Sequence, residues 1–252
     1  MTFWKKPLVQ APSAADAPGA RSAEQSAPTL PGRAARFARA FADAKSGLAL
    51  TEFAFMAPIV LSTGLMGTET AYYTISHMQV SQIAMQVADN ASRVGETDVL
   101  TARKVYEDDI NSSLVGAEKA GQTFGIFEQG RVIISSLQQN DEGGQWIAWQ
   151  RCRGAKVYDS TFGAEGDGAE GTAFPGMGET GAEITASSGT AVMFVEVAYD
   201  YEALTPFDWL DGEELVYTAA FNVRDQRDLT GLYQTEPATG VAACDVYSAD
   251  RP

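Results

Sequence analysis

The longest apolar run of the chain extends from Leu48 to Met66. It contains no lysine or arginine and a single carboxylate, Glu52. About 20 apolar residues in a helix, at about 1.5 Å each, match the ~30 Å hydrocarbon core of a bilayer. The pattern therefore predicts a transmembrane helix over residues 48–73. Pro58 predicts a bend within it, because proline removes one helical hydrogen bond.

Helical periodicity continues after this run, which predicts a helical extension over residues 74–118. Its apolar stripe follows alternating steps of four and three residues: Tyr73, His77, Val80, Ala84, Val87, Ala91 and Val94. This stripe packs either on the protein's own sheet or on neighbouring subunits. We expect a break near Gly95 and a second helix that begins at Thr97 or Asp98 and passes through Val99, Val105 and Ile110 toward Val115.

Short β-type runs follow, which predicts a β-rich domain over residues 119–252. The expected strands are residues 123–127, 131–137, 145–150, 191–201 and 215–223. Residues 146–149 are expected to bury one face. Residues 158–190 form a long Gly-rich, acidic loop, and the tail after residue 225 has no regular pattern. A long N-terminal helix followed by antiparallel strands predicts an α+β fold.

Charge is distributed unevenly along the 252 residues. The net charge of −15 divides into +4 for residues 1–47 and −19 for the remainder. Basic residues precede the apolar run, and the first one after it is Arg93. By the positive-inside rule the N-terminus is cytoplasmic and the bulk of the chain lies outside. The acidic body argues against nucleic acid, since phosphate binding needs clustered Lys and Arg.

The residues before the apolar run have the composition of a targeting segment. Residues 1–32 are rich in Ala, Pro, Ser and Gly, which predicts disorder. Residues 33–46 carry Arg33, Arg36 and Arg39 at every third position, typical of an amphipathic helix on a membrane surface.

The start of the apolar run resembles a known processing signal. Gly47 is followed by four residues, then by Glu52-Phe53, Ala54 and a long apolar stretch containing Pro58. This arrangement resembles the prepilin signal of type IV pilins, and is most similar to the TadE-like minor pilins, or pseudopilins, of the tight-adherence (Tad/Flp, type IVb) system. The specific match covers roughly residues 45–66, and beyond it only the layout is similar.

The resemblance implies roles for a few residues. A prepilin peptidase would remove residues 1–47 by cutting after Gly47, leaving Leu48 as the new N-terminus. Glu52 would serve processing and assembly, and Phe53 would serve assembly. The spacing from Gly47 also suggests that the charge of Glu52 is offset by the Leu48 amine of a neighbouring subunit. The implied location is the bacterial inner membrane, with a single pass and a periplasmic domain. The implied partners are the peptidase, other Tad pilus subunits, the inner-membrane assembly platform and membrane lipid.

Other interpretations of the apolar run remain open. It would also suit an uncleaved single-pass anchor that tethers a periplasmic binding module, with the acidic loop as its ligand site. A secretory signal peptide is another alternative, although its apolar core is usually shorter and only a poor cleavage site lies near Ala71. In that case the mature protein would be a secreted envelope enzyme whose active site the sequence does not reveal.

Candidate chemistry is sparse, and no enzyme, cofactor or metal site is predicted. The single histidine, His77, has no second histidine or thiol at ligand spacing. The acids of the Gly-rich loop suit Ca²⁺ as hard ligands, but they lack the EF-hand spacing and are more typical of a solvated flexible loop: Asp159, Glu165, Asp167 and Glu170. Cys152 and Cys244 either form a disulfide in an oxidising periplasm or remain buried thiols.

Overall fold

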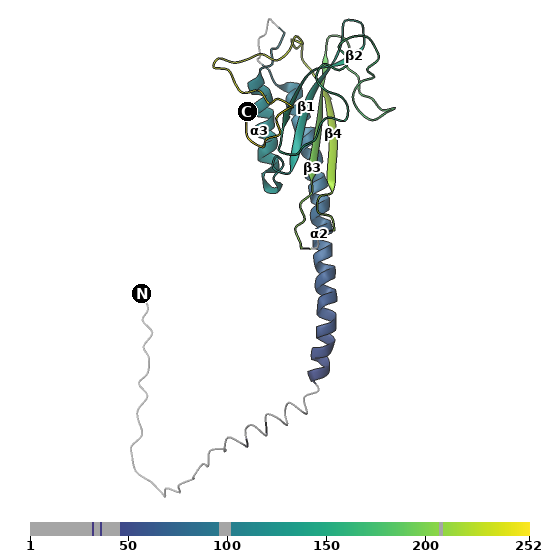
Figure 1. The fold of residues 1–252 in the computed structure, drawn as a ribbon, viewed down its shortest axis with the longest axis vertical. Helices are drawn as coiled ribbons and strands as arrows, with labels where there is room; N and C mark the ends of the chain where they lie inside the picture. Colours follow the sequence, from purple (N-terminus) through teal and green to yellow (C-terminus); the bar gives the residue numbers. More distant parts are fainter. Residues whose placement is uncertain (1–31, 33–35, 37–45, 96–101, 207–208) are drawn as a thin grey trace, which may run out of the picture. The chain divides into compact units, whose positions relative to one another are not determined.

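A computed structural model describes residues 32, 36, 46–95, 102–206 and 209–252. Figure 1 shows a long helix, a shorter helix and an antiparallel sheet, so the expected α+β class is confirmed. Residues 58–252 form one compact unit. The elements are α2 (Ser46–Arg93), α3 (Glu107–Gly121), the 3-10 turn η1 (Gln122–Phe124), β1 (Gly130–Gln139), β2 (Gln145–Arg153), β3 (Ala191–Asp200) and β4 (Glu214–Asn222). The expected disorder and amphipathic helix of the leader lie outside the described residues.

The four strands form one sheet in the order β2-β1-β3-β4, with antiparallel neighbours throughout. β1 and β2 are joined by a tight turn in which the Asn140 amide donates to the Gly144 carbonyl at 2.8 Å. β3 begins next to the end of β1, with Ala191 opposite Gln138, and ends with Tyr199 opposite Gly130. The four later strand predictions are therefore confirmed within a few residues.

The apolar stripe of α2 is buried on the protein's own sheet. Val80, Ala84, Val87 and Ala91 are all nearly inaccessible to solvent. They belong to one cluster with residues of α3 and with one face of the sheet, including Val195 of β3. For these positions the structure thus favours packing on the sheet over contact with neighbouring subunits.

The second helix begins later than the periodicity predicts. Val105 lies in an extended segment, and α3 begins at Glu107. The Tyr233 amide donates to the Val105 carbonyl at 2.8 Å, and the Glu107 amide donates to the Tyr233 carbonyl at 2.9 Å. The prediction of helix at Val105 was wrong because backbone pairing with the C-terminal tail holds this segment extended. Residues 97–99 lie outside the described residues.

The strand expected at residues 123–127 is also absent: these residues form η1 and a turn. Gly125 has a φ of +63° and the Gln129 amide donates to its carbonyl at 2.9 Å. Both edges of β1 are already occupied by β2 and β3. The apolar side chains Phe124 and Phe127 instead fill the core as part of a compact turn.

A β-bulge in β2 changes which faces its side chains occupy. The register pairs Ser136 with Trp149 but Leu137 with Ile147, which leaves Ala148 as the extra residue. Trp149 therefore packs in the cluster beneath the helices, whereas Ile147 packs on the opposite face. The expectation of a single buried face over residues 146–149 was wrong for this reason.

The Gly-rich segment 158–190 covers the face of the sheet away from the helices. Its apolar side chains join Ile147 and Phe194 in a second cluster, and they are Phe162, Phe174, Met177, Ile184 and Ala186. The four acids considered above for Ca²⁺ are exposed, as expected of a solvated loop. The loop is thus solvated on its outside but contributes its own layer of core.

Candidate functional site

The residues that resemble a processing signal lie in the first turns of α2. Gly47 is the second residue of the helix, and a Cβ placed on it would meet no atom within 4 Å. Leu48 and Phe53 are each 69% exposed, and Glu52 is exposed as well. Glu52 follows Leu48 by four residues, so the two positions lie on the same side of the helix, one turn apart. The structure brings these four residues together on one accessible helix end.

From Leu48 to Met66, α2 leaves its apolar side chains exposed except at the half-buried Ala57. None of its most apolar 18-residue window is buried by described parts of the chain, and by length and composition α2 qualifies as a membrane span. The exposed side chains include Phe55, Met56, Ile59, Val60, Leu61, Leu65 and Met66. Continuous apolar exposure of this kind marks a membrane or protein interaction site. The helix passes through Pro58, and the predicted bend stays a prediction.

The exposed run ends where Glu69 meets the sheet domain. Glu69 is fully buried, and its carboxylate accepts the Tyr201 hydroxyl at 2.5 Å, the Thr205 amide at 2.8 Å and the Leu204 amide at 3.2 Å. Burial of Tyr201 and its bond to this acceptor raise the pKa of the phenol above its ordinary value. The β3–β4 segment therefore binds α2 directly after its exposed apolar part, through hydrogen bonds to Glu69.

Sequence reasoning missed Glu69. Its signal was present, because a carboxylate within three residues of the end of an apolar run needs a partner. The partner lies 132 residues away in sequence, which periodicity cannot reveal.

His77 lies in the aromatic packing just above this junction. Its Nδ1 atom is 2.9 Å from the Tyr217 hydroxyl, and its ring packs edge-on against Tyr73 at 4.5 Å between centroids. These contacts join α2 to β4 and place the imidazole in a structural setting.

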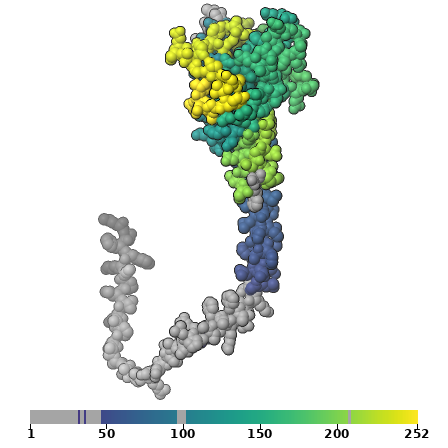
Figure 2. All heavy atoms as spheres, in the orientation of Figure 1, coloured from purple at the N-terminus to yellow at the C-terminus, as the bar shows by residue number. Residues whose placement is uncertain are grey.

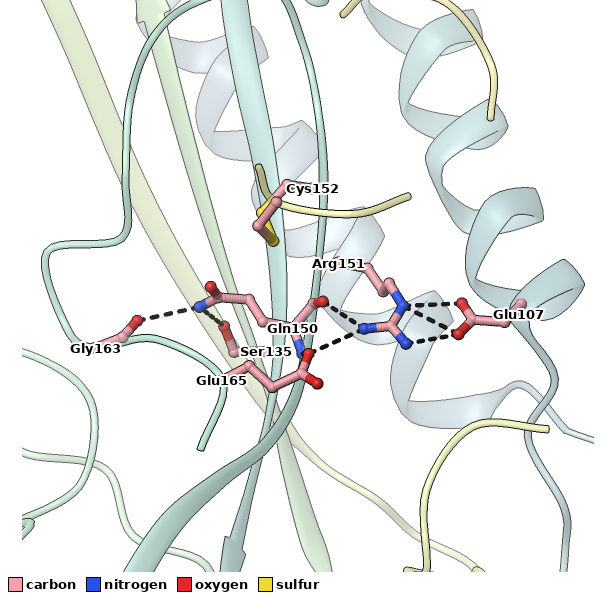
Figure 3. Close-up of polar contacts among 8 residues, drawn as sticks. Glu107, Ser135, Gln150, Arg151, Cys152, Gly163 and Glu165 are labelled. Carbon is pink, nitrogen blue, oxygen red and sulfur yellow. Dashed lines mark hydrogen bonds and ion pairs between the residues drawn. A yellow bond between two sulfur atoms is a disulfide. The ribbon is translucent and has the colours of Figure 1, made fainter. Parts of the chain in front are cut away.

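A second polar cluster joins α3, β2 and the Gly-rich segment (Figure 3). Arg151 of β2 makes three hydrogen bonds to Glu107, the shortest at 2.6 Å, and one to Glu165 at 3.0 Å. Burial alone lowers the pKa of the Arg151 guanidinium, but the bonds and charge of Glu107 raise it overall. The adjacent Gln150 side chain donates to Ser135 and to the Gly163 carbonyl. All of these bonds are internal, so the cluster cross-links α3, β2 and the Gly-rich segment.

The two cysteines form a disulfide, with 4.7 Å between their Cα atoms. Arg131 lies next to it, and its guanidinium donates to the carbonyls of Gly154, Val246 and Cys244. Its Cζ atom also lies over the Tyr247 ring, 4.1 Å from the ring centroid. The disulfide and Arg131 together fix the irregular C-terminal tail to β1 and β2.

Three of the four acids that suit Ca²⁺ are engaged by protein donors. Asp159 accepts the Tyr247 hydroxyl at 2.6 Å, Asp167 accepts the Ala164 amide at 2.8 Å, and Glu165 binds Arg151. Within residues 46–95, 102–206 and 209–252, no group of three or more His, Cys, Asp or Glu side chains is placed to hold a metal ion. Comparison of the chain with known protein families, with curated proteins and with solved structures finds no match.

Proposed function

We propose that this chain is a TadE-like minor pilin, or pseudopilin, anchored in the inner membrane and serving assembly of a Tad/Flp pilus for surface adhesion. Residues 1–47 act as a cytoplasmic leader that a prepilin peptidase removes after Gly47. The observation that carries the proposal is the accessible sequence Gly47 to Phe53 at the head of an uncovered apolar helix.

The length of the uncovered helix supports a single membrane pass. Residues 48–68 lie between the proposed cleavage point and Glu69, where contacts with the sheet domain begin. In a helix, 21 residues extend about 31 Å, which matches the hydrocarbon core. The sheet domain then begins at the membrane surface.

The disulfide and the charge distribution support a periplasmic domain. Structural disulfides persist in the oxidising periplasm and are rare in the bacterial cytosol. The bridge between Cys152 and Cys244 lies on the acidic side of the apolar helix, opposite the basic leader. Both features assign the same side to the sheet domain.

The position of Glu52 supports a role in assembly. A carboxylate one turn inside a bilayer is costly unless it is paired. Cleavage after Gly47 would create a cationic amine on Leu48, and the amine of an adjacent subunit would neutralise Glu52. This pairing would explain why Glu52, the fifth residue of the cleaved protein, is an acid.

Mass spectrometry of the protein isolated from its own membranes tests the proposal. We expect a mature N-terminus at Leu48. A Gly47→Val variant should keep its leader, whereas Gly64→Val should be cut normally. The two variants are a matched pair, since a Cβ at either glycine meets no atom within 4 Å. An intact Met1 in the wild type would instead indicate an uncleaved tether for a binding module, and a start near residue 72 would indicate secretion.

A further inference from the structure

The segment between β3 and β4 exposes large apolar side chains beside the helix. Leu204 is 59% exposed and Trp209 is 54% exposed, whereas Leu210 packs against the main core. Hydrogen bonds close the segment at its base, from the Gly212 amide to the Tyr201 carbonyl at 2.8 Å and from the Ala203 amide to Asp211 at 2.9 Å. The described residues on both sides of positions 207–208 are therefore held together at the base of the segment.

Glu69 fixes the level of this loop along the helix. It accepts the backbone amides of Leu204 and Thr205, and it follows Met66 by three residues. Three residues of helix rise about 4.5 Å. Figures 1 and 2 show the segment, in yellow-green, lying along α2 beyond the end of the sheet. Leu204 is thus held within about one helical turn of the last exposed apolar residue of the span.

We propose that this segment is a second membrane contact, which inserts Leu204 and Trp209 into the headgroup region at the outer end of α2. The inference rests on the membrane placement in the proposed function. Tryptophan is enriched at this depth because its ring is apolar and its N–H group prefers a polar setting. Leucine beside it adds apolar area at the acyl boundary.

The charge of the segment predicts which kind of lipid surface it binds. Its described residues include the acids Glu202, Asp211 and Glu213 and contain no lysine or arginine. Electrostatic attraction to anionic lipid is therefore excluded as the driving force. Binding depends on apolar insertion into a surface rich in zwitterionic headgroups, and it weakens as anionic lipid increases.

The contact would fix the orientation of the sheet domain. A single helix leaves the domain free to rotate about the helix axis. A second contact, held to that helix through Glu69, orients β3 and β4 relative to the membrane plane. Partner surfaces on the sheet domain would then face a defined direction.

Tryptophan quenching by brominated lipid tests the inference. The parent protein is the full chain with Trp4→Phe. It is placed in phosphatidylethanolamine-rich vesicles whose acyl chains carry bromine near the headgroup. The β1–β2 register puts Trp146 opposite Gln138, at the far end of the sheet from Gly130 and Tyr199. Eight residues along β3 separate the two ends, about 27 Å. Trp146→Phe is therefore the matched control for Trp209→Phe.

We expect bromine to quench the emission of the parent and of Trp146→Phe, and the quenching to be lost in Trp209→Phe. Bromine near the chain ends should quench less than bromine near the headgroup. Equal quenching in all three proteins, or none in protein that floats with the vesicles, overturns the loop contact and leaves the helix anchor standing. Failure of the full chain to float with vesicles overturns both.

Discussion

The Glu69 carboxylate accepts the Tyr201 hydroxyl at 2.5 Å in a site where neither side chain reaches solvent. Glu69 belongs to the long helix and Tyr201 directly follows β3. A buried carboxylate is tolerated only when donors surround it, and two backbone amides supply the rest. This contact lies where the exposed part of α2 meets the folded sheet domain.

Removal of Glu69 should destabilise that junction. In Glu69→Ala the buried Tyr201 hydroxyl and two partly buried amides lose their acceptor, and we expect the free energy of unfolding to fall by about 2–3 kcal/mol. Glu69→Gln keeps one acceptor oxygen and should lose less. Urea unfolding of the full chain in detergent measures the change, with the exposed Glu202→Ala as control. Equal stability of the Glu69 and Glu202 variants would contradict the role of this bond.

Neutralising Glu52 should abolish pilus assembly while the protein stays in the membrane. Its carboxylate has no role in the sheet domain that the structure describes, since it lies in the separate N-terminal unit and is exposed. The measurement is the amount of pilus sheared from cells expressing Glu52→Ala, with a membrane-fraction blot for the subunit. Glu142→Ala, an exposed acid in the β1–β2 turn, serves as control. Normal piliation would count against pairing of Glu52 with the new N-terminus.

Breaking the disulfide should loosen the C-terminal tail. Cys152 and Cys244 are 92 residues apart, so the bridge restricts the unfolded chain strongly. We expect Cys152→Ser with Cys244→Ser to lower the free energy of unfolding by about 2–4 kcal/mol. Limited digestion by carboxypeptidase should then advance further into the tail. Reductant should reproduce the effect in the wild type and change nothing further in the double variant.

Acid should remove a stabilising contribution from Glu118. Hydrogen bonds from Arg251 and Arg153 lower the pKa of this carboxyl from 4.5 to about 2. A carboxyl whose pKa is lower in the folded than in the unfolded state stabilises the protein at pH values above its unfolded pKa. This stabilisation is lost as the pH falls through the folded pKa. The contribution is small because Glu118 is 34% exposed.

The urea midpoints of wild type and Glu118→Gln measure this contribution. Their difference should be constant above pH 4.5 and vanish as the pH falls toward about 2. Glu179→Gln, an exposed acid in the Gly-rich segment, should follow the wild type throughout. A difference that grows on acidification would contradict the assignment.

Local pattern predicted much of the fold correctly. The stripe from Val80 to Ala91 is buried, and the runs that became β1 to β4 are strands. The errors share a cause. Val105 was assigned to a helix, but its backbone pairs with Tyr233 and is extended. Residues 123–127 were assigned to a strand beside β1, but β2 and β3 occupy both edges of β1. Propensity acts within a few residues, whereas these constraints come from residues far along the chain.

Sequence alone was enough to predict the apolar helix, the resemblance of residues Gly47 to Phe53 to a processing signal, the charge asymmetry and the single possible cysteine pair. All of these depend on composition or on spacing along one chain segment. The three-dimensional fold was needed to show that the β3–β4 segment binds Glu69, that Arg151 joins Glu107 to Glu165, and that the Gly-rich segment forms a layer of core. Each of these contacts joins residues distant in sequence, and their partners are defined only once the strand order has brought them together.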